Sequence, residues 1–263
     1  MPLLRIGWGM ADTLLLEEMT WPEVERALAG GFTSVVVAVG AIEQHGPHLP
    51  LLVDAARGDR LALEVARRLG RSLVGPTIRV GCSEHHMAFP GTISVSTDTL
   101  KAICVDYVGS LARHGFRTVY LVPSHGGNFA PLAAMLDELR AAGAPDCAVH
   151  AYTDLLEFVG LWQGAVREVA PGLDDRVGGH ADIAESSEML CIRPDLVREE
   201  LAEAGYVGGF DAALAERIFE EGLRAVTLNG VLGDPRGMSR EIGERCIARA
   251  AEGIVAAFRA VRG

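Results

Sequence analysis

The stretch Ser34-Val35-Val36-Val37-Ala38-Val39 is an unbroken run of apolar, mostly β-branched residues. It leads directly into Gly40-Ala41-Ile42-Glu43-Gln44-His45-Gly46-Pro47-His48-Leu49-Pro50, which is rich in polar and turn-forming residues. A continuous apolar run is typical of a strand that is covered on both faces, as in a parallel sheet. Ligands in such folds bind beyond the carboxyl ends of the strands. The stretch therefore predicts an α/β fold with functional groups in the loop that follows this strand.

Predicted helices and strands alternate on both sides of this run. A helix over 21–29 ends at Gly30-Gly31, and a second helix covers 55–69. The next predicted elements are one or two short strands within 72–80, strands over 117–122 and 147–152, and helices over 98–114 (N-cap Thr97) and 129–142 (N-cap Asn128). This rhythm predicts a three-layer α/β/α fold with a mostly parallel central sheet, in a single domain over 1–263. Two amphipathic helices, 198–225 and 240–262, are expected to complete the chain.

Composition excludes several classes of protein. The chain carries 24 Lys and Arg against 35 Asp and Glu, a formal net charge of −11, and has no basic run. This argues against nucleic-acid or anionic-membrane partners. The longest apolar stretch, 35–42, is far shorter than the roughly 20 residues of a membrane helix. The five cysteines are widely spaced and odd in number, which indicates reduced thiols in a cytoplasmic protein rather than disulfides or a thiolate metal site.

Three acidic and imidazole side chains follow the first strand. Glu43 and His45 are two residues apart, so an extended segment would project them to the same side. Turn-forming residues then allow Asp54 to fold back toward them. Two carboxylates and an imidazole form a ligand set suited to Zn²⁺, Mn²⁺ or Fe²⁺. The alternative is a polar loop in which Asp54 only caps a helix.

Two further motifs follow later strands. His125 lies in Ser124-His125-Gly126-Gly127-Asn128, directly after the strand predicted to end at Val122, although a glycine-rich turn with an incidental histidine is equally common. His180 and Glu185 lie five residues apart across a predicted loop-to-helix junction, where Glu185 could simply cap the helix. Together the motifs place five side chains at one end of one sheet: Glu43, His45, Asp54, His125 and Glu185. With one shared carboxylate, they would suit two divalent ions.

The segment 81–92 contains the adjacent histidines His85 and His86 and the turn Phe89-Pro90-Gly91-Thr92. Adjacent histidines point in different directions in an extended chain, so one metal is not expected to bind both. The turn is expected to place Phe89 beside a polar pocket.

These motifs, in this order, resemble the signature of the creatininase family. The resemblance runs from Glu43-Gln44-His45-Gly46-Pro47-His48-Leu49-Pro50 with Asp54, through 83–92 and 125–128, to 180–187, and covers roughly residues 20 to 195. Family members are metal-dependent hydrolases of unusual amide bonds and commonly form hexamers. The resemblance thus implies two divalent ions per subunit, most readily Zn²⁺ and otherwise Mn²⁺ or Fe²⁺. It also implies a homo-oligomer, and a small-molecule amide as substrate.

The resemblance assigns roles to individual residues. It makes Glu43 and His125 ligands of one metal, His45 a ligand of the other, and Asp54 the bridge between them. Creatininase has a glutamate two residues after the histidine that matches His125, but here that position is Gly127. In members with the His-Gly-Gly-Asn form, the glutamate that matches Glu185 is implied to complete the second site.

A hydroxide that bridges the two metals is then implied to attack an amide carbonyl. The leaving nitrogen needs a proton, and His180 matches a family histidine that faces the substrate, so we expect His180 to donate that proton or orient the carbonyl, with a supporting role beside Glu185 as the alternative. The remaining substrate contacts are expected from His85, Phe89, Arg176 and Asp182. Residues 174–179 lack the tryptophans that line the creatininase pocket, so a charged pocket for an acidic or zwitterionic substrate is expected instead of a creatinine site.

Other functions remain open on sequence grounds. The same ligands could serve a metal-dependent lyase or isomerase, or a peptidase that trims a small modified peptide. A binding or regulatory protein on a degraded enzyme scaffold is a further alternative, although the retained ligand set argues against it.

Overall fold

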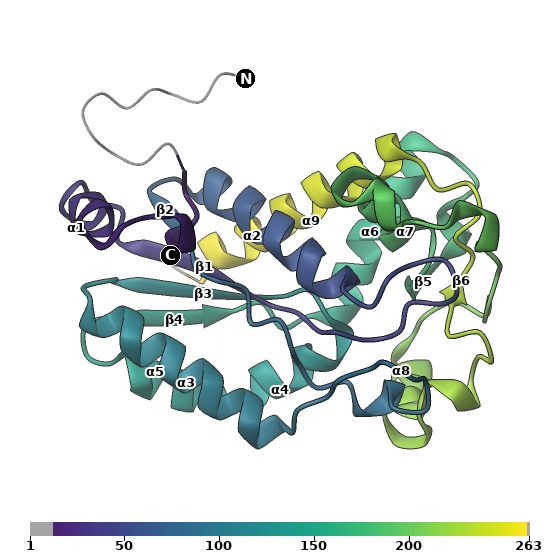
Figure 1. Cartoon of the computed structure of the whole chain (residues 1–263), viewed down its shortest axis with the longest axis horizontal. Coiled ribbons are helices and arrows are strands. Elements are labelled where there is room, and N and C mark those ends of the chain that lie inside the picture. The colour runs from purple at the N-terminus through teal and green to yellow at the C-terminus, as the bar shows by residue number, and fades with distance from the viewer. Residues whose placement is uncertain (1–12, 262–263) are drawn as a thin grey trace.

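The computed structural model describes residues 13–261, and its centre is a parallel sheet (Figure 1). The four strands lie in the order β2 (Ser72–Val74), β1 (Ser34–Val39), β3 (Thr118–Pro123), β4 (Ala148–Ala151). All three pairings are parallel, and β1 lies between β2 and β3 with Val36 opposite Val74 on one side and Tyr120 on the other. The apolar run at 34–39 is thus an inner strand, as predicted.

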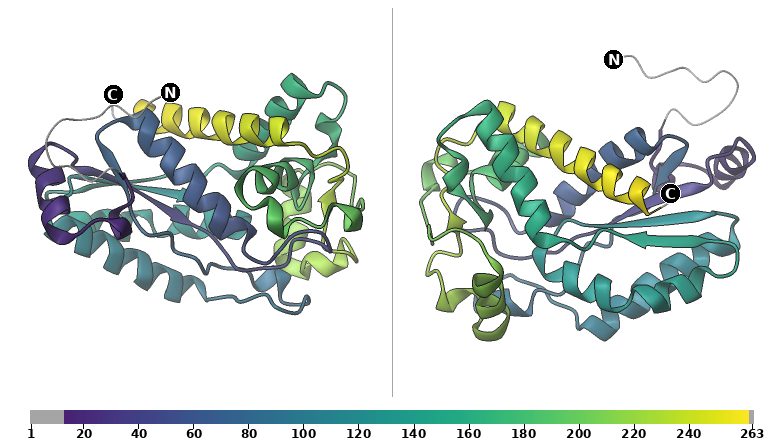
Figure 2. Two further views of the ribbon diagram at one scale, coloured as in Figure 1. Left: turned by 45° about the horizontal axis from the view of Figure 1, so that its top comes forward. Right: turned by 180° about the vertical axis from the view of Figure 1, so that it is seen from behind.

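Helices cover both faces of this sheet (Figures 1 and 2). One layer contains α2 (Val53–Leu69), α6 (Leu155–Val169) and α9 (Arg240–Ala260). The other contains α3 (Thr97–Arg113), α4 (Phe129–Ala134) and α5 (Leu136–Gly143), with α1 (Trp21–Ala29) at the β2 edge. Alternate β1 residues enter separate cores, since Val36 packs in the first layer and Val35 and Val37 in the second. This is the three-layer α/β/α arrangement expected from the sequence.

A second, smaller unit lies beyond the carboxyl ends of the main strands. There β5 (Val177–His180) pairs antiparallel with β6 (Leu232–Gly233), and α7 (Ile183–Ile192) follows β5 directly. The helix α8 (Ala212–Glu221) lies at the same end of the molecule (Figure 1). These elements enclose the loops that follow β1 and β3. Among the described residues, no helix has the length and apolar character needed to cross a membrane.

Several predicted boundaries need correction. The N-cap of α3 is Ser96 and not Thr97, because the Ser96 hydroxyl accepts a hydrogen bond from the Thr99 N–H. The prediction of short strands within 72–80 is confirmed, since β2 covers Ser72–Val74 and an isolated bridge joins Val39 to Ile78. The helix predicted over 129–142 is interrupted at Met135, and α2 starts two residues earlier than predicted.

The single helix predicted over 198–225 is wrong. Within that range only α8 is an α-helix, and it starts after Asp211, whose side chain accepts a hydrogen bond from the Leu214 N–H. The glycines Gly205, Gly208 and Gly209 precede it, and they weaken a helix by about 1 kcal/mol each relative to alanine. The helix predicted over 240–262 is present as α9, with residue 262 outside the described range.

Candidate metal centre

The five predicted ligands meet in one buried cluster, although they come from four separate parts of the chain. Glu43 and His45 lie in the loop after β1, Asp54 in the first turn of α2, His125 directly after β3, and Glu185 in the first turn of α7. All five side chains are at most 3% exposed. The carboxyl ends of β1 and β3 are neighbours in the sheet, which brings the first four together, and α7 adds Glu185 from the second unit.

One candidate site is formed by Glu43, Asp54 and His125, whose ligand atoms all lie within 4.8 Å of one another. His125 Nδ1 lies 3.2 Å from Glu43 Oε1 and 3.4 Å from Asp54 Oδ2. A carboxylate–carboxylate–imidazole triad of this kind is a common first-row metal site.

A second candidate site shares Asp54 with the first. His45 Nε2 lies 3.5 Å from Asp54 Oδ1 and 3.6 Å from Glu185 Oε2. Because Asp54 directs one oxygen toward each imidazole, its carboxylate lies between the two triads. The two groups therefore have the geometry of adjacent sites with a bridging carboxylate.

Unsatisfied polar atoms show that a cation fits this cluster. Both carboxylate oxygens of Glu43, Nε2 of His45 and Oδ2 of Asp54 are fully buried and have no hydrogen-bond partner. A buried unpaired polar atom costs about 1–3 kcal/mol, and a charged one costs more. These atoms converge on one region, and bound cations would satisfy all of them at once.

The two histidines are oriented for metal binding by backbone carbonyls. His45 Nδ1 lies 3.1 Å from the carbonyl oxygen of Glu43, and His125 Nε2 lies 3.0 Å from that of Cys82. A ring N–H that donates to a carbonyl leaves the other nitrogen with a free lone pair. In the unprotonated rings, the nitrogens that carry this lone pair are His45 Nε2 and His125 Nδ1, and both face the carboxylates.

The pKa values reflect how densely these charges are packed. Burial alone would lower the pKa of His45, but the carboxylates of Asp54 and Glu185 raise it to about 9. Burial raises the pKa of Glu43. Burial opposes ionisation of Asp54 as well, yet His45 and His125 hold its pKa well below the usual range. In the absence of metal, protons on the histidines thus balance the carboxylates, and metal binding would displace them.

Arg57 is a functional candidate that sequence reasoning missed. Its buried guanidinium donates through Nη1 to Glu185 Oε1 (2.6 Å) and to the Ser124 carbonyl (3.1 Å). Its Nε donates to Glu188, and the guanidinium lies 4.5 Å from the ring centroid of Trp162. The same Nη1 lies 3.4 Å from Asp54 Oδ1, so Arg57 contacts two of the candidate ligands, Glu185 and Asp54. The signal in the sequence was an arginine three residues after Asp54, on the apolar face of a helix.

Packing around Gly127 leaves no room for a side chain at this position. A Cβ at this position would overlap the Cys82 carbonyl oxygen and lie 2.7 Å from Cε1 of His85. No longer side chain fits there without movement of the backbone. A carboxylate for the second site therefore has to come from elsewhere, and Glu185 is in place to supply it.

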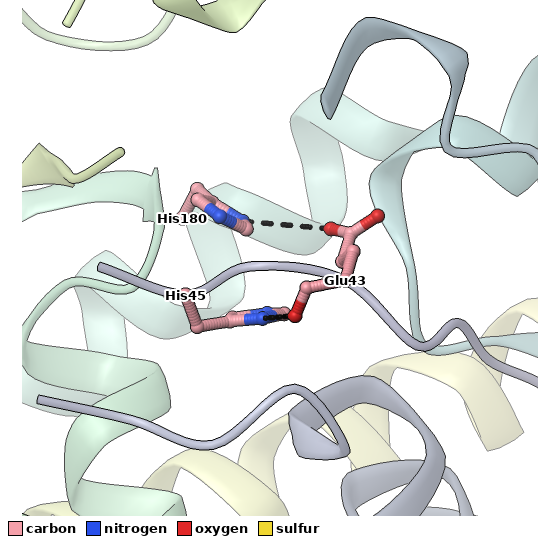
Figure 3. Close-up of side chains that lie close together, drawn as sticks. All are labelled: Glu43, His45 and His180. Atoms are coloured by element: carbon pink, nitrogen blue, oxygen red, sulfur yellow. Dashed lines mark hydrogen bonds and ion pairs between the residues drawn. The ribbon is translucent and has the colours of Figure 1, made fainter. Parts of the chain in front are cut away.

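His180 lies at the edge of the cluster (Figure 3). Its Nε2 lies 2.9 Å from the Gln44 carbonyl oxygen and 3.0 Å from the Gln44 side-chain Nε2, and its Nδ1 lies 3.9 Å from Glu43 Oε1. Its ring also lies against that of His45, with centroids 4.3 Å apart. Glu43, His45 and His180 form a third group within ligand distance. In the tautomer in which Nε2–H donates to the Gln44 carbonyl, the Nδ1 lone pair is directed toward Glu43.

A cavity opens from the cluster, and of the four predicted substrate contacts only His85 lines it. Asp182 is buried as the N-cap of α7, and its oxygens accept hydrogen bonds from four backbone N–H groups. Arg176 lies near Asp234, with its Nη1 3.6 Å from Asp234 Oδ2, and Phe89 packs in the cluster around Leu214. The pocket that the structure forms is therefore not the charged pocket expected from the sequence.

His48 and Asn128 connect the loops around the cluster to neighbouring elements. His48 Nε2 lies 2.8 Å from Ser186 Oγ, so it ties the loop to α7. Asn128 does not cap a helix. It donates to the carbonyls of Val39 and Gly40 and accepts from the Cys82 N–H, which joins the ends of β1 and β3 to the 81–92 segment.

Comparison with known proteins gives consistent matches. The family model for creatininase, described as creatinine amidohydrolase, matches residues 17–258. A mycofactocin precursor peptide peptidase from Mycolicibacterium smegmatis is 35% identical over 237 residues, covering 87% of this chain and 85% of the relative. A creatinine amidohydrolase from Pseudomonas putida is 31% identical over 261 residues, covering 95% and 98%. A solved structure described as creatininase Mn superposes with a TM-score of 0.72 at 29% identity, covering 95% of this chain and 98% of the other.

Proposed function

The chain belongs to the creatininase family of metal-dependent amidohydrolases, and we propose that it hydrolyses a cyclic or otherwise non-standard amide C–N bond. The observation that carries this proposal is the position of Asp54 between two buried triads, one with Glu43 and His125 and one with His45 and Glu185. This arrangement would hold two divalent ions per chain. Zn²⁺ suits the imidazole and carboxylate donors best, and Mn²⁺ or Fe²⁺ are alternatives.

Two such ions, when bound, activate water and polarise the carbonyl oxygen. The chain's own residues do the rest. Arg57 fixes the orientation of Glu185, and the carbonyls of Glu43 and Cys82 fix the two imidazole rings. His180 directs Nδ1 into the cavity, and we propose that this atom takes a proton as water adds to the carbonyl and returns it to the leaving nitrogen. One C–O bond forms, the C–N bond breaks, and one water is consumed.

Hydrolysis of a small modified peptide is the second candidate. It is supported by the 35% identity to the mycofactocin precursor peptide peptidase, which exceeds the 31% identity to the creatinine amidohydrolase. Both candidates use the same chemistry on a carbonyl bonded to nitrogen. They differ in whether the substrate is a small ring or formamide, or the end of a peptide.

The experiment is a hydrolysis screen of cyclic amides, formamides and short peptides with Zn²⁺ or Mn²⁺ added. Product mass separates hydrolysis, which adds one water, from lyase or isomerase chemistry. The matched control is Asp54→Asn, which keeps the size of the side chain and removes the shared carboxylate. If no substrate is hydrolysed and chelation changes nothing, the proposed function is wrong.

The cellular setting belongs to the same proposal. We propose a cytoplasmic homohexamer, with support from the resemblance to hexameric family members and from the five cysteines, none of which forms a disulfide. Light scattering on the purified chain measures the assembly directly. A monomeric mass would contradict the hexamer without affecting the proposed chemistry.

A further inference from the structure

The cavity above the candidate metal centre has two chemically different walls. One wall is formed by the cluster itself, with Glu43, Asp54, His125, His180 and Glu185. The other, which we call the apolar wall, is formed by aliphatic and aromatic side chains, mostly from α6 and α8, and includes Phe158, Trp162, Ile218 and Phe219, with Phe129 from α4 and Leu232 from β6. A group bonded to the reacting amide would therefore contact hydrocarbon as soon as it leaves the polar cluster.

Phe219 is the most informative member of the apolar wall. It lies on α8 and is 47% exposed, whereas Phe158 and Trp162 on α6 are buried. Its ring meets that of His85 edge to face, with centroids 4.7 Å apart, and the His85 ring in turn stacks on the ligand candidate His125 at 5.6 Å. An exposed aromatic ring so close to a polar cluster gains free energy when an apolar group covers it.

The charges around the cavity also favour an uncharged group at the apolar wall. Among the described residues that line it, none is a lysine or arginine. Arg57 is buried and is occupied by Glu185, Glu188 and Asp54. A substrate carboxylate placed against the apolar wall would lose its hydration and find no cation, which is strongly unfavourable.

We propose that the substrate carries an uncharged aromatic or large aliphatic group next to the amide that is cleaved, and that Phe219 contacts this group. The inference rests on the proposed function for the position of the amide at the cluster. It replaces the expectation of an acidic or zwitterionic substrate, since Arg176 and Asp182 do not reach the cavity.

The test is calorimetric binding to the zinc-loaded full chain. The probes are hydantoin, 5-benzylhydantoin and 5-(4-carboxybenzyl)hydantoin, which share one cyclic amide and differ only in the group that would meet the apolar wall. We expect the benzyl group to tighten binding by about tenfold or more. The remote carboxylate should weaken binding by about tenfold relative to the benzyl compound.

Variants of Phe219 test whether this residue contacts the benzyl group. Phe219→Ala should weaken binding of the benzyl compound by about three- to tenfold and leave hydantoin unchanged. Phe219→Arg should tighten binding of the carboxybenzyl compound relative to the wild type. Leu156→Ala is the matched control, because Leu156 is a similarly exposed side chain, 46% on α6, that does not line the cavity.

Two results would overturn the inference: a benzyl group that adds no affinity to hydantoin, or a carboxybenzyl compound that binds the wild type as tightly as the benzyl compound. Neither would affect the proposed function, which fails on different measurements, namely absence of metal and absence of hydrolysis. Conversely, the binding comparison decides the chemistry of the pocket even if hydantoins are not hydrolysed.

Discussion

The guanidinium of Arg57 donates a hydrogen bond from Nη1 to Glu185 Oε1 across 2.6 Å. The same guanidinium is bound to Glu188 and lies over Trp162. Its Nη1 also lies 3.4 Å from Asp54 Oδ1, so one buried cation balances three buried acids, and two of those acids are candidate metal ligands. Mutation should therefore destabilise the protein more at Arg57 than at a partly exposed arginine.

Arg57→Met should lower the free energy of unfolding by about 3–5 kcal/mol, because it leaves buried carboxylates without a partner. Urea unfolding measures this. The double variant Arg57→Met/Glu188→Met should recover part of the loss, since it removes both charges of one pair. Arg60→Met is the matched control on the same helix. Its ion pairs with Glu64 and Glu244 are partly exposed, so the change should cost at most about 1 kcal/mol. Equal effects of the two single variants would contradict this role.

Gly127 should not tolerate a side chain. Gly127→Ala is expected to destabilise the protein by about 1–3 kcal/mol, because a Cβ there overlaps the Cys82 carbonyl oxygen and crowds His85. Gly127→Glu should be at least as destabilising and should not add a metal ligand. Gly109→Ala is the control, since this helical glycine has open space around it, and the change should stabilise by up to about 1 kcal/mol. A neutral Gly127→Ala would show that the backbone moves there without cost.

The metal-free protein should lose stability as the pH rises from about 6.5 to about 9. Burial opposes protonation of His45, but Asp54 and Glu185 raise its pKa to about 9 in the folded state, above the ordinary value of 6.5. A raised folded pKa stabilises the protein below the unfolded pKa, and that stabilisation is lost as the pH passes through the folded pKa. Unfolding in chelator at several pH values measures the slope.

Zinc should change this pH dependence. A ligating imidazole has to be unprotonated, so apparent zinc affinity should rise over the same pH range in which the metal-free protein weakens. His45→Gln should flatten the slope of the metal-free protein. A metal-free protein whose stability is constant or rises between pH 6.5 and 9 would argue against the charge arrangement described for His45.

His180→Gln should reduce kcat by about 10²–10⁴-fold and leave the metal content unchanged, if Nδ1 transfers a proton as proposed. The assay uses whichever substrate the hydrolysis screen identifies, and metal content is measured on the same sample. A parallel loss of metal would instead make His180 a ligand, as its distance to Glu43 and His45 would allow.

The core of the fold and the ligand set were accessible from the sequence because both depend on local patterns. The run at 34–39 is apolar without interruption, and its position in the middle of a parallel sheet is confirmed. The polar residues after β1 and β3 meet because the carboxyl ends of neighbouring parallel strands share one edge of the sheet. The metal roles of Glu43, Asp54 and the other ligand candidates remain predictions.

The pocket could not be predicted in the same way, because it depends on contacts between distant segments. Asp182 is predicted from the sequence as a substrate contact, but it lies inside a turn where backbone N–H groups donate hydrogen bonds to its carboxylate. Most of the apolar wall comes from α6 and α8, which are about 60 residues apart in the chain. Neither helix carries a recognisable sequence motif. Arg57 and Glu188 were not paired because they lie on different helices, 131 residues apart.

The position of Asp54 between two metal triads is the central claim, and anomalous X-ray diffraction at the zinc edge, from crystals grown with Zn²⁺, tests it most directly. We expect two peaks per chain, one bound by Glu43, Asp54 and His125 and the other by His45, Asp54 and Glu185, each about 2.0–2.2 Å from its ligand atoms. A cluster without a peak, or peaks that do not share Asp54, would contradict the account.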